Sequence, residues 1–273
     1  MIQGVDMDHT YDFLSNYYRN IDEDSRLESK HGQIEFLTTM HYVERYLAPG
    51  AKVIEIGAGT GRYSRAISGQ GYSVEAVELF ESNIEVFKDK LEPEHHINIS
   101  QGNALDLSVF ADDSFDITLL LGPMYHLYTK EDKQQALSEA LRITKNDGVL
   151  FVAYCISDAS IALGGFTLKH FNVEDFILRG KIDPVTFDTF SLPEDIIELV
   201  RKEDIDLLME GLPAKRLHYV ATDLLTGFIS DTVDSMSEEE FVLYLRYHLA
   251  ICERADMVGA THHSLDILSK MMG

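Results

Sequence analysis

The chain has 273 residues and carries 46 acidic side chains against 23 basic ones, which gives a formal net charge of −23 at pH 7. Nucleic-acid affinity depends on neutralising phosphates, so this composition argues against a nucleic-acid partner. No run approaches the roughly 18 consecutive apolar residues of a membrane span, and the first residues lack the basic and apolar parts of a signal peptide. Cys155 and Cys252 are expected to be buried thiols of a reducing compartment. We therefore expect a cytoplasmic protein without a membrane partner.

Residues 1–47 are expected to form a helical segment added to the main fold. Apolar residues recur at helical spacing between Ile34 and Leu47, and this spacing predicts a helix that packs on the first strand. An aromatic-rich stretch precedes it and contains Tyr17 and Tyr18. Two interpretations stay open for this stretch: a lid over the mouth of an active site, or an aromatic stripe that is ordinary core.

A glycine-rich turn follows the first predicted strand, which runs from Val53 to Ile56. The turn and its approach read Glu55-Ile56-Gly57-Ala58-Gly59-Thr60-Gly61, and a helical stretch comes next. Glycine permits positive φ and lets a ligand approach without a Cβ in the way. A turn that opens onto a helix N-terminus suits the polar part of a nucleotide-like cofactor. The third glycine comes one residue earlier than in the dinucleotide fingerprint G-x-G-x-x-G, whose third glycine is replaced here by Arg62.

This E-x-G-x-G-x-G form resembles the first motif of class I S-adenosylmethionine (SAM)-dependent methyltransferases. The resemblance implies that SAM binds against the turn and leaves as S-adenosylhomocysteine. The residues of this segment that the resemblance places in the cofactor site are Glu55, Gly57, Ala58, Gly59 and Gly61.

The second predicted strand, 73–79, carries an acid near its end. Glu78 lies about 20 residues past the glycine turn, where a carboxylate is placed to accept hydrogen bonds from both ribose hydroxyls. The resemblance adds Leu79 to the cofactor site. The alternative is an exposed glutamate at the end of a strand in a very acidic protein.

The third predicted strand, 97–101, leads into a polar turn. The family commonly has an Asp or Asn followed by a small residue at this place, and Asn103 and Ala104 match that pair. The resemblance implies that both face the adenine of SAM. The alternative is an Asx turn, because an asparagine at the end of a strand often bonds its own backbone.

The fourth predicted strand, 115–121, ends at Leu121, which the resemblance places at the methionine portion of SAM. The next residues, Gly122-Pro123-Met124-Tyr125, lack the polar head and the second proline found in amino-directed nucleic-acid methyltransferases, so we exclude base N-methylation. Tyr125 is a further candidate for the substrate lid. His126 is the candidate catalytic base, since imidazole titrates near physiological pH. A wall residue of the pocket is the alternative.

The remaining elements complete an α/β fold. A helix is predicted from Thr129, a fifth strand at 149–153, and two late strands at 218–222 and 264–268 separated by a helix at 238–252. In the family the last strand inserts antiparallel. The predicted fold is therefore a Rossmann-like, seven-stranded methyltransferase sheet with helices on both faces.

Four segments are expected: the lid segment 1–47, a SAM-binding core 48–155, a cap 156–216 inserted between strands five and six, and the core completion 217–273. Roughly sixty residues between neighbouring strands is far longer than ordinary connections, so the cap should have its own core. Helical runs are predicted in it at 193–202 and 203–210.

The predicted function is direct in-line transfer of the SAM methyl group to an oxygen or nitrogen of a small molecule. A SAM-binding sensor or interaction protein without turnover is the alternative, followed by aminopropyl transfer, which requires acids after strand four. No metal is expected, because the pairs His95-His96 and His262-His263 have no cysteine or acid at ligand spacing and are interpreted as surface or turn residues. The acceptor and the oligomeric state stay open.

Overall fold

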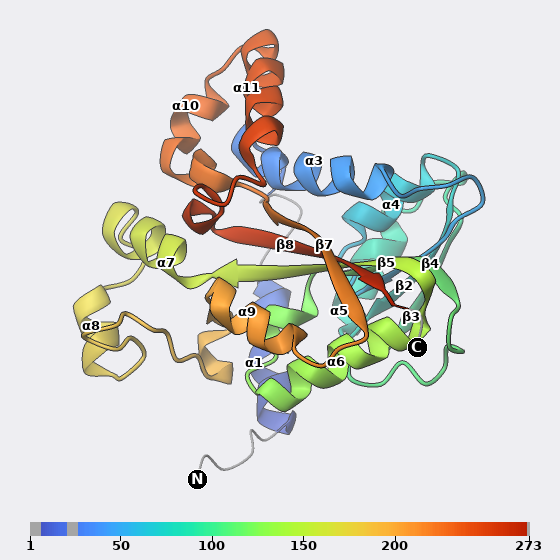
Figure 1. Ribbon diagram of the computed structural model, residues 1–273, viewed down its shortest axis with the longest axis horizontal. Coiled ribbons are helices and arrows are strands. Elements are labelled where there is room, and N and C mark those ends of the chain that lie inside the picture. The colour runs from blue at the N-terminus through green and yellow to red at the C-terminus, as the bar shows by residue number, and fades with distance from the viewer. Residues whose placement is uncertain (1–6, 21–26, 272–273) are drawn as a thin grey trace.

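The computed structural model describes residues 7–20 and 27–271. Two helices, α1 (Met7–Asn20) and α3 (Lys30–Glu44), precede an alternation of strands and helices (Figure 1). Helix α3 begins after Ser29, whose hydroxyl accepts the Gly32 N–H. The helix predicted near the first strand is therefore confirmed, and the aromatic stretch before it is helical too.

The central sheet has eight strands in the order β3-β2-β1-β4-β5-β8-β7, and the short β6 pairs with β5. Strands β1 to β5 run parallel, whereas β8 is antiparallel to both β5 and β7. The last strand is thus inserted between β5 and β7, as predicted. The strands are β1 (Lys52–Ile56), β2 (Ser73–Glu78), β3 (Ile97–Gln101), β4 (Phe115–Leu120), β5 (Thr144–Ile156), β6 (Leu199–Val200), β7 (Ala214–Ala221) and β8 (His263–Lys270).

Helices pack on both faces of this sheet. The longer ones after α3 are α4 (Arg62–Ser68), α5 (Glu81–Asp89), α6 (Lys130–Ile143), α9 (Lys202–Met209) and α11 (Glu238–Ile251). Because successive side chains of a strand point to opposite faces, Ile54 and Ile56 pack with α6 and α9, whereas Val53 packs with α3 and α4. Strands buried on both faces read as continuous apolar runs, which is why the sequence revealed them.

Short elements complete the fold. One of them, η1 (Pro123–His126), follows β4. Three others lie between β7 and β8: η4 (Leu224–Ile229), α10 (Ser230–Asp234) and η5 (Val258–Ala260). Helix α11 stands away from the sheet at the top of Figure 1 and packs against α3. Strand β5 begins at Thr144, before the predicted start, and Asp147 within it takes a left-handed φ of 62°.

The insert 156–216 differs from its prediction. It contains α7 (Ser157–Ser160), a π-helical turn η2 (Ile161–Thr167), α8 (Val173–Leu178) and η3 (Pro193–Asp195) before β6 and α9. The predicted helix at 193–202 is wrong, because Ile196 takes a φ of 66° that ends the helical turn after Asp195. Helix α9 confirms the helical run predicted at 203–210, since it spans Lys202–Met209.

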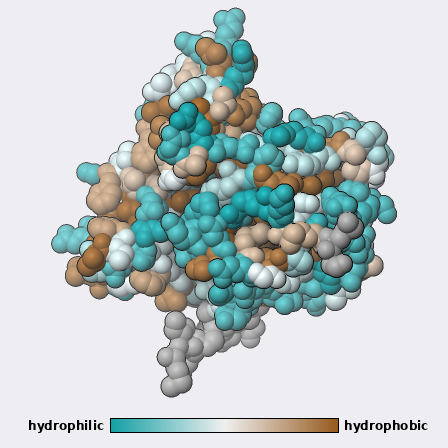
Figure 2. All heavy atoms as spheres, in the orientation of Figure 1, coloured by the Kyte–Doolittle hydropathy of each residue, from teal (hydrophilic) through white to brown (hydrophobic). Residues whose placement is uncertain are grey.

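The two halves of the insert pack differently. Ile205 and Leu208 of α9 belong to the core beneath the sheet, so this end of the insert is part of a helical layer rather than of a cap. The first half has its own small cluster, formed around Ile161, Val173 and Ile182. Apolar side chains also reach its surface, on the left of the view in Figure 2.

Candidate active site

A cavity of about 400 Å³ lies at the carboxyl ends of the parallel strands, where β1 separates the two directions of strand order. Ligands of open α/β sheets bind at this switch point, and the volume lies within the range of small-molecule sites. The cavity wall includes these residues predicted to bind the cofactor: Glu55, Gly57, Ala58, Gly59, Glu78, Leu79, Asn103, Ala104 and Leu121. Gly61 is outside the lining.

The three glycines of the turn differ in what surrounds them. A Cβ on Gly57 would lie 2.6 Å from Cδ of Pro123, and one on Gly61 would lie 2.1 Å from the Phe87 ring. A Cβ on Gly59 would meet nothing within 4 Å, although Gly59 has a φ of 54°. Packing therefore requires glycine at the outer two positions, whereas Gly59 leaves open space beside the cavity.

Glu55, near the end of β1, binds the helix that follows the glycine turn. Its Oε2 accepts the backbone N–H of Ser64 at 2.9 Å and also the Ser64 hydroxyl, which ties the end of β1 to the first turn of α4. Burial raises the pKa of Glu55 to about 7, and the hydrogen bonds from Ser64 oppose that rise. The geometry thus shows a positioning role for this acid.

Glu78 lies at the end of β2 and faces the glycine turn. Its Oε2 accepts the Gly59 N–H at 2.8 Å, while Oε1 accepts from the Phe80 N–H at 3.0 Å and from Nδ2 of Asn83 at 3.1 Å. The residue is only 4 % exposed, so the alternative of an exposed strand-end glutamate is wrong. Burial raises its pKa, although these donors favour the charged form.

Asn103 and Ala104 line the cavity after β3. The Asn103 Oδ1 accepts the Leu105 N–H at 3.0 Å, so the Asx turn considered for this residue is present. An Asx turn and a place in the cavity wall are compatible, because the amide group retains its Nδ2 donors for other contacts.

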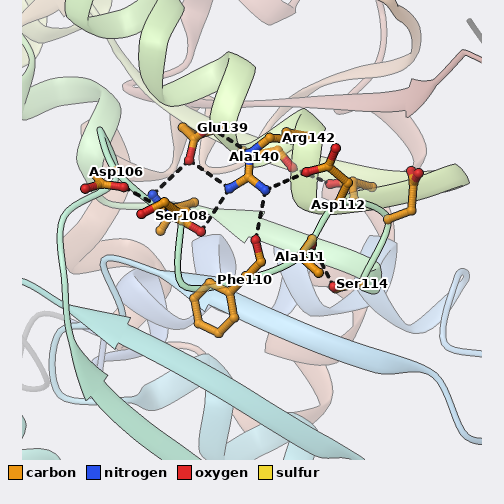
Figure 3. A network of polar contacts seen from close by, with 12 residues as sticks. Asp106, Ser108, Phe110, Ala111, Asp112, Ser114, Glu139, Ala140 and Arg142 are labelled. Atoms are coloured by element: carbon orange, nitrogen blue, oxygen red, sulfur yellow. Dashed lines mark hydrogen bonds and ion pairs between the residues drawn. The ribbon is translucent and has the colours of Figure 1, made fainter.

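Arg142 of α6 anchors the loop that follows Asn103 (Figure 3). Its Nη1 donates to the Phe110 carbonyl and its Nη2 to the Leu107 carbonyl, at 2.8 and 2.9 Å. The same guanidinium pairs with Glu139 and Asp112. Glu139 also accepts the Leu107 N–H at 2.9 Å. One ion pair therefore binds the loop twice over: its carboxylate accepts a loop N–H, and its guanidinium donates to loop carbonyls.

His126 follows β4 and lies between two partners. Its Nδ1 is 2.9 Å from the Ile196 carbonyl oxygen, which only accepts hydrogen bonds, so we assign the ring proton to Nδ1. Its Nε2 then accepts from the Tyr18 hydroxyl at 2.6 Å. Burial lowers the pKa of His126 to about 4, so the ring is neutral at pH 7.

The three predicted lid residues do not all line the cavity. Tyr18 and Tyr125 line the cavity, whereas Tyr17 is outside the lining and packs edge-on against Tyr18, with ring centroids 5.3 Å apart. The insert 156–216, all of it described, contributes no lining residue, and it reaches the site through the Ile196 carbonyl. Helix α1, by contrast, contributes Thr10, Tyr11, Leu14 and Tyr18 to the cavity lining.

A second imidazole group, which no sequence signal identified, also lines the cavity. His263 begins β8 and lines the cavity with Glu35 and Thr222, so its interpretation as a surface or turn residue is wrong. Its Nδ1 donates to Oδ2 of Asp223 at 2.8 Å, although the two residues are 40 positions apart. The antiparallel pairing of β7 with β8 brings them together.

Comparison with known proteins agrees with this geometry. The model of a methyltransferase domain family matches residues 54–152. A demethylmenaquinone methyltransferase from Clavibacter sepedonicus is 32% identical over 111 residues, which cover 40% of this chain and 43% of that protein. The match therefore spans less than half the length of this curated relative.

Solved structures share the fold. A possible histamine N-methyltransferase from Thermotoga maritima aligns with a TM-score of 0.55 and 18% identity, over 96% of this chain and all of that one. A Haemonchus contortus phosphoethanolamine N-methyltransferase, solved with S-adenosylhomocysteine, aligns with a TM-score of 0.60 and 16% identity over 97% of this chain and 49% of that one.

Residues 54–152 thus match a methyltransferase domain, and the chain has the Rossmann-like fold of solved SAM-dependent methyltransferases. Within the described part of the chain, no helix is long and apolar enough to cross a membrane.

Proposed function

We propose that this chain moves the methyl group of SAM to a small molecule bound between the end of β4 and helix α1. The observation that carries the proposal is the buried Glu78 carboxylate facing the open space at Gly59, inside a cavity at the switch point of the sheet. A buried acid next to a turn with room for a ligand is what recognition of a ribose requires.

The residues present fit SAM. Glu78 would hold the ribose hydroxyls, Asn103 and Ala104 the adenine, and the backbone from Gly57 to Gly59 the methionine portion. When bound, SAM supplies an electrophilic methyl group on its sulfonium. The chain then mainly has to align the acceptor with the methyl–sulfur bond, and proximity and orientation contribute roughly 7–11 kcal/mol.

Tyr18 and His126 are proposed to orient the acceptor. A histidine whose pKa is near 4 is a weak base at neutral pH, so proton removal by His126 is not its main contribution. Instead, Nε2 of His126 accepts the Tyr18 hydroxyl proton, so the tyrosine oxygen acts toward the hydroxyl or amine of a methyl acceptor as a hydrogen-bond acceptor. The Ile196 carbonyl fixes the ring tautomer that makes this possible.

The acceptor is proposed to have an apolar or aromatic body. Tyr11, Leu14, Tyr18 and Tyr125 form a wall that suits such a group. Oxygen and nitrogen remain the proposed methyl acceptors, and the name of the curated relatives adds a carbon of a quinone-type ring. A screen for the methyl acceptor should therefore contain phenols, amines and quinols.

Isothermal titration calorimetry with SAM and S-adenosylhomocysteine tests the proposal. We expect micromolar binding of both, and weaker binding by Glu78→Ala, whereas Glu75→Ala on the same strand should bind like the wild type. Release of S-adenosylhomocysteine with any acceptor then separates an enzyme from a sensor. Failure of the folded protein to bind either nucleoside would overturn the proposal.

A further inference from the structure

We propose that Asp223, His262 and His263 form a binding site for a divalent transition cation of the zinc class, beside the part of the cavity wall that His263 lines. One ligand atom of each of these residues lies within 4.8 Å of the others. The proposal does not rest on methyl transfer, because ion binding is measured directly and without SAM.

The chain positions Asp223 firmly. Its Oδ1 accepts the Thr261 hydroxyl at 2.6 Å and the backbone N–H groups of His262 and His263 at 2.9 and 3.2 Å. These bonds fix one oxygen of the carboxylate against the turn before β8. The other oxygen, Oδ2, is therefore aimed at the imidazole of His263, 2.8 Å from its Nδ1.

Negative charge gathers around that nitrogen. Oε2 of Glu35, on helix α3, lies 3.4 Å from the same Nδ1, so two carboxylates face one ring nitrogen. The ring of His262 packs edge-on against that of His263, with centroids 4.3 Å apart, and adds a second imidazole. Two carboxylates and two imidazoles around one point favour a cation there.

The ligand types indicate the class of ion. Imidazole nitrogen with carboxylate oxygen suits zinc and its neighbours in the transition series, whereas magnesium and calcium prefer oxygen alone. Binding at Nδ1 replaces its proton: the metal–nitrogen bond forms, the N–H bond breaks, and the proton leaves to buffer. Since His263, Glu35 and Thr222 line the cavity, an open coordination position would face a bound acceptor.

The test uses the full chain without an affinity tag, freed of metal with a chelator and titrated with Zn²⁺ or Co²⁺. We expect one ion per chain by elemental analysis, with proton release on binding. His263→Gln and Asp223→Asn should each weaken metal binding by more than about 100-fold. Losing a residue that only holds a metal ligand costs up to about 100-fold in affinity, and losing a ligand itself should cost more. Asparagine retains an oxygen for the donors of residues 261–263.

The control is His96→Ala, which removes an exposed histidine of the chain's other histidine pair. It should bind the ion like the wild type. Circular dichroism establishes that each variant is folded. A wild type that binds less than one ion per chain, or a His263→Gln variant with unchanged affinity, would overturn the site, and either result is independent of whether SAM binds.

Discussion

The hydroxyl of Tyr18 lies 2.6 Å from Nε2 of His126, and this contact joins the N-terminal helix α1 to the end of β4. On the far side of the ring, Nδ1 of His126 and the Tyr128 hydroxyl both donate to the carbonyl of Ile196. Three segments far apart in the sequence therefore meet at one imidazole. The His126 ring links helix α1, the carboxyl end of β4 and the insert.

Tyr18→Phe tests the orienting role of this contact. The variant keeps the ring but removes the oxygen offered to the acceptor, so we expect acceptor kcat/KM to fall about 3- to 10-fold, the range of one hydrogen bond. SAM affinity should change less than about twofold. Tyr17→Phe is the matched control, because Tyr17 lies outside the lining. Equal losses in both variants would assign the effect to helix α1 as a whole.

The lowered pKa of His126 predicts a dependence of stability on pH. Because its folded pKa of about 4 lies below its ordinary 6.5, the unfolded chain binds the proton more readily, and stability falls as pH decreases from about 6.5 to about 4. The full loss is roughly 3 kcal/mol for this ring. Buried His248 has a pKa lowered to about 4 as well and adds to the same window.

Urea unfolding at pH 7 and pH 5 measures this effect. His126→Gln should lose less unfolding free energy than the wild type between the two pH values. The pH dependence due to His248 and to the carboxylates remains in both proteins. If the unfolding free energy of His126→Gln changed with pH as much as that of the wild type, the pKa of His126 in the folded protein would be ordinary.

The part of the cavity wall that follows β1, β2 and β3 could be predicted because its sequence signals are local. The glycine turn, Glu78 and Asn103 each follow directly on an apolar strand, and parallel strands bring their carboxyl ends to one edge. That Tyr18 rather than Tyr17 lines the cavity could not be predicted, since it depends on the rotation of one helix. The insert was expected to cover the site, but the sequence contains no signal for where a connection packs.

The cluster around Asp223 and His263 depends on long-range strand pairing. Asp223 reaches His263 only because β7 and β8 pair antiparallel with Ala221 opposite Ser264. A search for acids at metal-ligand spacing in the sequence misses such a partner. A backbone carbonyl such as that of Ile196 leaves no sequence signal at all, because every residue has one.

The different surroundings of the turn glycines predict opposite effects. Gly61→Ala should destabilise the fold by about 1–3 kcal/mol, because its Cβ would overlap the Phe87 ring. Gly59→Ala meets no atom and carries only the backbone cost of positive φ, about 1–2 kcal/mol. It should weaken SAM binding more than Gly61→Ala does among molecules that remain folded.

Thermal unfolding and calorimetry separate the two glycine variants. The expected pattern is a lower Tm with little change in SAM affinity for Gly61→Ala, and lower affinity for Gly59→Ala. The reverse pattern would place the ligand against Gly61 rather than Gly59.

Arg142→Lys tests the anchoring of the loop after Asn103. The guanidinium reaches four different partners with a planar set of donors, and an ammonium group cannot reproduce that geometry. The Leu107 and Phe110 carbonyls would lose their donors, so we expect a loss of about 1–3 kcal/mol in unfolding free energy. Lys145→Arg, at a half-exposed ion pair with Asp116, is the control and should change stability by less than about 1 kcal/mol.

The Arg142 variant should also affect the cofactor. If the loop holds Asn103 and Ala104 in place, amide hydrogen exchange in residues 105–114 should rise and SAM affinity should fall, while Glu78 continues to bind its donors. Faster exchange without any change in SAM affinity would mean that β3 alone positions the adenine side of the cavity, and that the Arg142 network serves only stability.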